Sequence, residues 1–270
     1  MVAAIVEEGR VWYLYGVIPQ GQCLPADAGG TVEAIVHSSL AALVEPVSAQ
    51  ELSPDTSAAQ PELPEWVVRR ARRHEAVLAE AARHGAVVPA RLYTLFSDAQ
   101  AVRLSLATHE EKFLAALDRV RGREEWGLKL FCAEDRLRAL QTADPEAREL
   151  EAALEGASPG YAYVLGKQRD ARLAALLATR IEDAVGDAID VLELKTADLQ
   201  PLRITLPLAA EPPSGVTMVL NLAALVDLAE RPAFHSAVKR LARRWRGEGF
   251  TFEVSGPWPP FNFCNGEEEA

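Results

Sequence analysis

The chain has 270 residues, 49% of them hydrophobic and 25% charged, which suffices for one large domain or two ordinary ones with buried cores. Its apolar runs are shorter than the roughly 18 residues of a membrane span, and residues 1–10 lack the pattern of a secretory signal. The net charge of −11 disfavours general binding to nucleic acid. We therefore expect a cytoplasmic globular protein whose partners include neither a membrane nor nucleic acid.

The first part of the chain shows both strand and helix patterns. β-Branched and aromatic residues predict strands over residues 11–19, 31–39, 40–47 and 86–96. The polar, proline-rich stretch 48–64 predicts an exposed loop. Apolar residues at helical spacing predict helices over residues 64–85 and 97–122, the second with Ser97 or Asp98 as its N-cap.

The second part predicts strands over residues 125–133, 190–197, 215–226 and 250–258. Helices are expected over 134–160, with a break at Pro145, and over 161–189 and 231–249. The resulting order is strand, helices, strand, strand, helix, strand. This order is typical of the ferredoxin-like split βαβ unit, here with extra helices after its first strand.

These patterns predict an α+β protein with two domains. The N-terminal α+β domain is expected over residues 1–120. The C-terminal domain, expected over 121–255, is a modified ferredoxin-like fold with extra helices. Residues 256–270 form a C-terminal tail that we expect to pack between the two domains.

Two histidines stand in stretches that resemble the start of a zinc-protease helix. That motif needs a second histidine four residues after the first, so that both rings reach one ion. Leu78 occupies this position after His74, and the stretch at His109 fails in the same way. We therefore expect His74 on the helix surface or at a domain contact.

Residues 160–168 resemble a phosphate-binding loop, which requires four residues between its glycines and a Ser or Thr after its lysine. Here five residues separate Gly160 from Gly166, and Gln168 follows the lysine. The sequence also lacks a Cys-x-x-Cys pair and a Gly-x-Ser-x-Gly elbow. No catalytic, cofactor-binding or metal-binding residue is therefore assigned, and we expect a protein that is not an enzyme.

Basic residues cluster on two of the expected helices. One cluster comprises Arg69, Arg70, Arg72 and Arg73, and the other Lys239, Arg240, Arg243, Arg244 and Arg246. Such clusters contact phosphates in some proteins, but more often they form solvated faces that pair with acidic residues. The chain has 39 acidic residues, so we expect these two clusters to form solvated helix faces that pair with acids.

The C-terminal tail combines rigid backbone with large apolar side chains. Its candidate interaction residues are Gly256, Pro257, Trp258, Pro259, Pro260, Phe261 and Phe263. Proline restricts the backbone before anything binds it, and aromatic rings supply apolar area with few rotatable bonds. The tail therefore either closes a gap within the protein or binds a partner, and the two roles are compatible. The acidic end, Glu267 to Glu269, is expected to stay solvated.

The three cysteines, Cys23, Cys132 and Cys264, are odd in number and far apart in the sequence. This spacing argues against a disulfide framework. We expect three free thiols, as in a reducing cytoplasm.

Several short motifs, in this order, resemble those of the gas vesicle proteins GvpL and GvpF. They are "WYLYGVIP" at 12–19, "LAALVEPV" at 40–47, "RRHEAVLAEA" followed by "VVPARLYTLF", "EEWGLKLF" at 124–131, "PGYAYVLGKQRD", "MVLNLAALV" and "SGPWPPFNF". The chain departs from the family at Tyr93, where a small residue is usual, and after Pro260, where Tyr and Ser usually follow.

The resemblance implies a structural or assembly protein of gas vesicles, the gas-filled buoyancy organelles of some prokaryotes. It implies the vesicle shell protein GvpA and other accessory proteins as partners, a location at the gas vesicle in the cytoplasm, and neither catalysis nor a cofactor. It also marks Trp126 and Gly127 as structural residues at the start of the second domain. The alternatives are a small-molecule-binding or enzymatic α+β protein and, third, a nucleic-acid binder.

Overall fold

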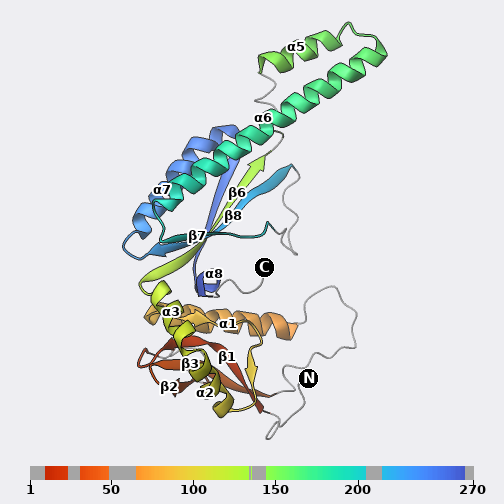
Figure 1. Cartoon of the computed structure of the whole chain (residues 1–270). Helices are drawn as coiled ribbons and strands as arrows, with labels where there is room; N and C mark the ends of the chain where they lie inside the picture. Colours follow the sequence, from red (N-terminus) through yellow and green to blue (C-terminus); the bar gives the residue numbers. More distant parts are fainter. Residues whose placement is uncertain are drawn as a thin grey trace, which may run out of the picture. The chain divides into compact units, whose positions relative to one another are not determined.

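Helices and two β-sheets make up the computed structural model, which describes residues 10–23, 31–48, 65–133, 135, 144–204 and 215–264 (Figure 1). The chain is thus an α+β protein, as predicted. Its contacts divide it into two units. Unit 1 contains the chain up to Glu125 and the segment from Pro257 onward, and unit 2 runs from Trp126 to Gly256.

The sheet of unit 1 has the strand order β2-β3-β1-β4, and β5 also pairs with β1. The strands are β1 (Arg10–Pro19), β2 (Glu33–His37), β3 (Leu40–Ser48), β4 (Val88–Pro89) and β5 (Leu95–Phe96). The helices are α1 (Glu65–His84), α2 (Ala99–Thr108), α3 (Glu110–Val120) and the short C-terminal α8 (Phe261–Cys264).

A β-bulge in β1 decides which of its side chains face α1. The antiparallel register with β3 shifts between Leu14 and Gly16, which pair with Val44 and Leu43. Tyr13 before the shift and Tyr15 at the shift lie in the core cluster, and Ile18 lies in it afterwards, so the inward positions change from odd to even. Gly16 itself faces α1 and β4 so closely that a Cβ atom would lie 2.7 Å from the Val88 carbonyl oxygen.

Unit 2 has a sheet with the strand order β7-β8-β6-β9. Its strands are β6 (Arg123–Ala133), β7 (Asp198–Pro201), β8 (Val216–Asp227) and β9 (Phe250–Trp258). Its helices are α5 (Pro145–Leu154), α6 (Pro159–Glu193) and α7 (Arg231–Trp245), followed by a 3-10 turn at Arg246–Glu248. The ferredoxin-like description of this unit stays a prediction.

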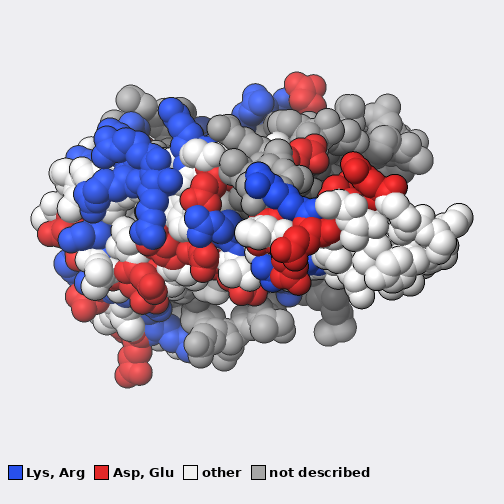
Figure 2. All heavy atoms as spheres, turned by 90° about the horizontal axis from the view of Figure 1, so that it is seen from above, with Lys and Arg blue, Asp and Glu red and all other residues white. Residues whose placement is uncertain are grey.

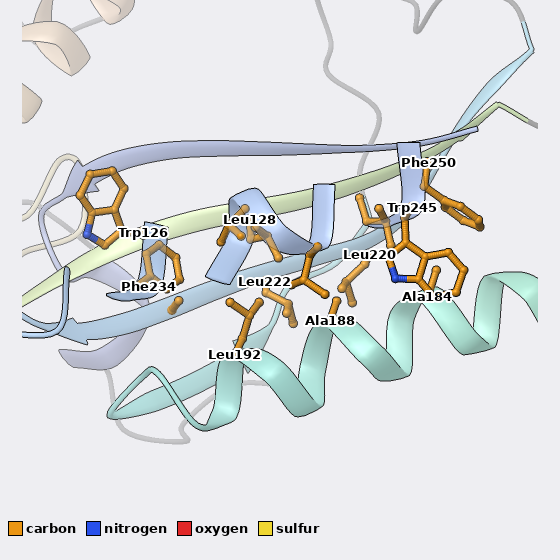
Figure 3. Packing of buried hydrophobic residues seen from close by; sticks show 14 of the residues in the cluster. Trp126, Leu128, Ala184, Ala188, Leu192, Leu220, Leu222, Phe234, Trp245 and Phe250 are labelled. Atoms are coloured by element: carbon orange, nitrogen blue, oxygen red, sulfur yellow. The ribbon is translucent and has the colours of Figure 1, made fainter. Parts of the chain in front are cut away.

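The core of unit 2 lies between its sheet and α6 and α7 (Figure 3). Ala184, Ala188 and Leu192, spaced four residues apart, put one face of α6 against Leu220 and Leu222 of β8. The even-numbered residues 126, 128, 130 and 132 of β6 join the same cluster, as the period of a strand requires. The two alanines leave room for the helix to approach the sheet closely.

Three expected elements differ from the structure. The helix expected over 97–122 is two helices, because His109 has a non-helical backbone (φ −113°, ψ 18°). The strand expected over 86–96 is reduced to β4 and β5. The strand expected over 190–197 is wrong: α6 continues to Glu193 because Leu192 extends its buried face, and β7 starts at Asp198. Most of the helix expected before Pro145 lies outside the described residues.

Candidate functional site

The C-terminal tail adds a short helix to unit 1. Gly256 adopts a φ of 128°, a backbone region that favours glycine. Pro259 and Pro260 are buried, and the Phe261 N–H donates to the Pro259 carbonyl at 2.7 Å where α8 begins. The prolines therefore guide the chain from the end of β9 into α8.

Two aromatic rings of the tail pack into unit 1. Phe261 joins the core cluster under α1, and its ring stacks on His74 with 6.4 Å between the centroids. Phe263 is only 1% exposed, and the Arg119 guanidinium lies over its ring at 5.9 Å. Burying an aromatic side chain of this size contributes about 1.5–3 kcal/mol, so the tail is an integral part of the unit 1 core.

A buried carboxylate holds the tail in position. Glu125 is 4% exposed and accepts two hydrogen bonds from Asn262, one from its backbone N–H and one from its side-chain Nδ2. Burial raises the pKa of Glu125, while both bonds from Asn262 act to lower it. Asn262 thus provides the partner that a buried carboxylate requires.

Trp258 differs from the other tail aromatics, because its side chain is 40% exposed. It forms part of the wall of a cavity of about 210 Å³, together with residues from Pro257 to Pro260 and from the end of α1. The cavity has a mainly apolar lining, and an accessible tryptophan at such a place is typical of an interaction surface.

Trp126 and Gly127 lie in β6, at the start of unit 2. Trp126 is 8% exposed and packs against Phe234 and edge-on against His235, with ring centroids 6.2 and 4.5 Å away. Its indole Nε1 is buried and has no hydrogen-bond partner among the described residues. These contacts agree with a structural role.

A buried ion pair network, which the sequence analysis missed, links β1, β3 and α1 in unit 1. Glu45, 7% exposed, accepts hydrogen bonds from Tyr15, Thr31, Arg70 and Arg73, with Arg73 contributing Nε at 3.0 Å and Nη2 at 2.8 Å. Burial raises the pKa of Glu45, but the bonds from Arg73, Thr31 and Tyr15 outweigh it and lower the pKa to about 2. The available signal was a single acid within the apolar strand 40–47, which needs a buried partner.

His74 is buried in unit 1, 3% exposed, so its expected place at the surface is wrong. Its Nδ1 lies 2.9 Å from the Tyr13 hydroxyl and its Nε2 lies 3.1 Å from the Ala90 carbonyl oxygen. Burial lowers the pKa of His74. A neutral ring with its proton on Nε2 satisfies both contacts, since Nε2 then donates to Ala90 and Nδ1 accepts from Tyr13.

Tyr93 has a left-handed backbone, with a φ of 66°, which is unfavourable for a residue with a side chain. Its ring packs edge-on against Tyr13 and Trp66, with centroids 6.4 and 5.8 Å away. The turn between β4 and β5 therefore contains a tyrosine with a strained backbone, and the ring of this tyrosine packs against Trp66.

The basic cluster of α7 and the following 3-10 turn is exposed, and Lys and Arg side chains gather in places on the face of the molecule that Figure 2 shows. Arg244 pairs with Asp187 of α6 at 2.7 Å. Lys239, Arg240, Arg243 and Arg246 form no ion pair with any residue that the structure describes. This face is thus solvated, with partial pairing to acids.

Within the described residues, no helix is long and apolar enough to span a membrane. No group of three or more potential metal ligands occurs in this part of the chain either. None of the three cysteines forms a disulfide among the described residues; Cys23 is exposed and Cys132 is buried.

Comparison with known proteins gives a consistent result. The family described as gas vesicle synthesis protein GvpL/GvpF matches residues 11–265. The chain is 29% identical to gas vesicle protein L of Streptomyces sp. (strain CB03234), over 96% of this chain and 95% of that protein, and 28% identical to gas vesicle protein F of the same strain, over 93% and 98%. The crystal structure of GvpF from Anabaena sp. PCC7120 has the same fold, with a TM-score of 0.68 at 17% identity over 96% of this chain and 99% of that one. The chain belongs to the GvpL/GvpF family of gas vesicle synthesis proteins.

Proposed function

We propose that this protein is a structural or assembly protein of gas vesicles that works by binding other vesicle proteins, the shell protein GvpA among them. The family match over residues 11–265 carries this proposal. Its place of action is the gas vesicle in the cytoplasm, and its role is not catalytic. The exposed Trp258 beside an apolar cavity supports a function in protein binding.

We further propose that residues 256–263 pack between the two units and so present one rigid surface to the partner. Two observations support this role for the tail. Phe261 and Phe263 belong to the core of unit 1, whereas β9, which leads into them, belongs to the sheet of unit 2.

Co-purification tests the proposal. The tagged chain is expressed with a complete set of gas vesicle genes, and GvpA and the accessory proteins are quantified in the eluate. We expect them with the wild-type protein and at least several-fold less with Trp258→Ala. Leu104→Ala on α2 is the matched control, because Leu104 is a large apolar residue, 65% exposed, outside the cavity lining. Absence of every vesicle protein from the wild-type eluate would overturn the proposal.

A further inference from the structure

One face of α1 carries an aromatic residue and three arginines around a second cavity. Trp66, Arg69, Arg70 and Arg73 line this cavity of about 300 Å³ in unit 1. Their spacing of three, four and seven residues from Trp66 places them on a single helix face. A cavity of this size is at the small end of the range for ligand sites.

A buried carboxylate, that of Glu45, faces part of this group of arginines. Glu45 pairs with Arg70 and Arg73. Arg69 is exposed and forms no ion pair with any described residue, although Glu65 stands one turn before it. Arg69 therefore adds to the cavity wall a guanidinium group that pairs with no acid among the described residues.

The network around Glu45 also fixes the direction of the Arg73 guanidinium. Its Nε and Nη2 donate to Glu45, Tyr15 and Thr31. Its Nη1 makes no hydrogen bond to the described residues and is left to donate elsewhere. A planar guanidinium that is held on one edge is already oriented for an oxyanion on its other edge.

Trp66 adds an apolar wall. Its ring is half-buried and packs against the ring of Tyr93, and this contact restricts its orientation. A rigid indole beside guanidinium groups suits a ligand that carries both an oxyanion and an apolar or planar part.

We propose that this cavity is a binding site for a carboxylate-bearing segment of a partner protein, with Arg69 and Nη1 of Arg73 as donors and Trp66 as the apolar contact. Carboxylate is favoured because two arginines of this cavity, Arg70 and Arg73, already bind one in Glu45. A long polyanion such as nucleic acid is disfavoured by the net charge of −11. The inference deepens the proposed function. Only the identification of the partner as a vesicle protein rests on that function.

Fluorescence anisotropy of a labelled eight-residue peptide with four glutamates and one phenylalanine tests the site on the full chain at low salt. Arg69→Ala should weaken binding about tenfold, the effect of one charge-assisted contact. Arg72→Ala is the matched control, because Arg72 is an exposed arginine of the same helix that does not line the cavity. It should change the affinity less than twofold, and a glutamine version of the peptide should not bind.

Three outcomes of the peptide assay would overturn the proposal. They are no binding to the wild-type chain, equal losses in the two arginine variants, or tighter binding of a phosphorylated peptide or an oligonucleotide than of the acidic peptide. The proposal would also be overturned if the free chain self-associates and Arg69→Ala abolishes this self-association, because the ligand would then be a second copy of the chain. Peptide binding that persists in a chain that never co-purifies with vesicle proteins would support the site and refute the proposed function.

Discussion

Asn262 donates two hydrogen bonds to Glu125, from its backbone nitrogen to Oε2 at 2.9 Å and from Nδ2 to Oε1 at 2.6 Å, although 137 positions separate the two residues in the sequence. These hydrogen bonds offset part of the free energy that is needed to bury the Glu125 carboxylate. The tail of this family member is held by a polar contact as well as by its aromatic rings.

Asn262→Ala should lower the free energy of unfolding by about 1–3 kcal/mol, because it leaves a buried carboxylate oxygen without its donor. The loss should become smaller as the pH falls, since protonation of Glu125, whose pKa burial raises, removes the unpaired charge. Denaturant unfolding at several pH values measures both effects. Asn221→Ala is the control, because Asn221 makes an exposed bond to the Arg203 carbonyl in unit 2. An equal loss in both variants would contradict the prediction.

Glu45 should make the protein sensitive to acid. Its pKa falls from the ordinary value of 4.5 to about 2 in the folded state, so its ionised form stabilises the fold. The stabilisation, about 3 kcal/mol, is fully present above pH 4.5 and is lost as the pH falls toward 2. Glu45→Gln should unfold more easily at pH 7, by about 3–5 kcal/mol, and depend less on pH between 4.5 and 2. An unchanged pH dependence would show that Glu45 is not the responsible group.

Tyr93→Gly should be more stable than Tyr93→Ala by about 1 kcal/mol. Both substitutions remove the contacts with Tyr13 and Trp66, but only glycine relieves the left-handed backbone. Comparing the thermal unfolding of the two variants isolates the backbone term, because the lost side chain is nearly the same. The reverse order of stability would argue against strain at this turn.

Trp126→Ala should destabilise unit 2 by about 3–5 kcal/mol, because it removes a large side chain from the core beside Phe234. Trp126→Phe is the informative comparison. It keeps much of the ring and deletes a buried Nε1 that has no acceptor in the described structure, so its cost should be about 1 kcal/mol. The unfolding of unit 2 is measured in both variants. Similar losses of unfolding free energy in Trp126→Ala and Trp126→Phe would refute this account.

The thiols should differ in reactivity. Cys23 is exposed, whereas burial, with Glu125 nearby, raises the pKa of Cys264 to about 12. A thiol reagent at pH 8 should modify Cys23 quickly and Cys132 and Cys264 only on unfolding, because the thiolate is the reacting form. The total in denaturant should be three. Rapid labelling of Cys264 in the folded protein would indicate that the tail leaves its site.

Local patterns predicted most of the elements, because they depend on spacing within a few residues. The helix expected over 64–85 lies at Glu65–His84, and the strand expected over 250–258 matches β9. The boundary of α6 was missed because Leu192 fits a strand and a helix equally well, and only its packing with Ala188 decides between them.

The site was harder to predict, because its contacts join distant parts of the chain. The pairing of Glu45 with Arg70 and Arg73 needs β3 and α1 to meet in space, which no spacing rule reveals. The tail was marked correctly as rich in aromatic residues, but the same composition fits a buried and an exposed Trp258. Tertiary structure alone separates the two.

The discontinuity of unit 1 has a consequence for synthesis of the protein. Phe263, part of its interior, is translated only after the whole of unit 2. At about 5–20 residues per second, the ribosome needs on the order of ten seconds to make the intervening chain. During this delay the nascent first unit lacks its last helix, and the apolar surface that Phe261 and Phe263 later cover is open to chaperones or to other newly made chains.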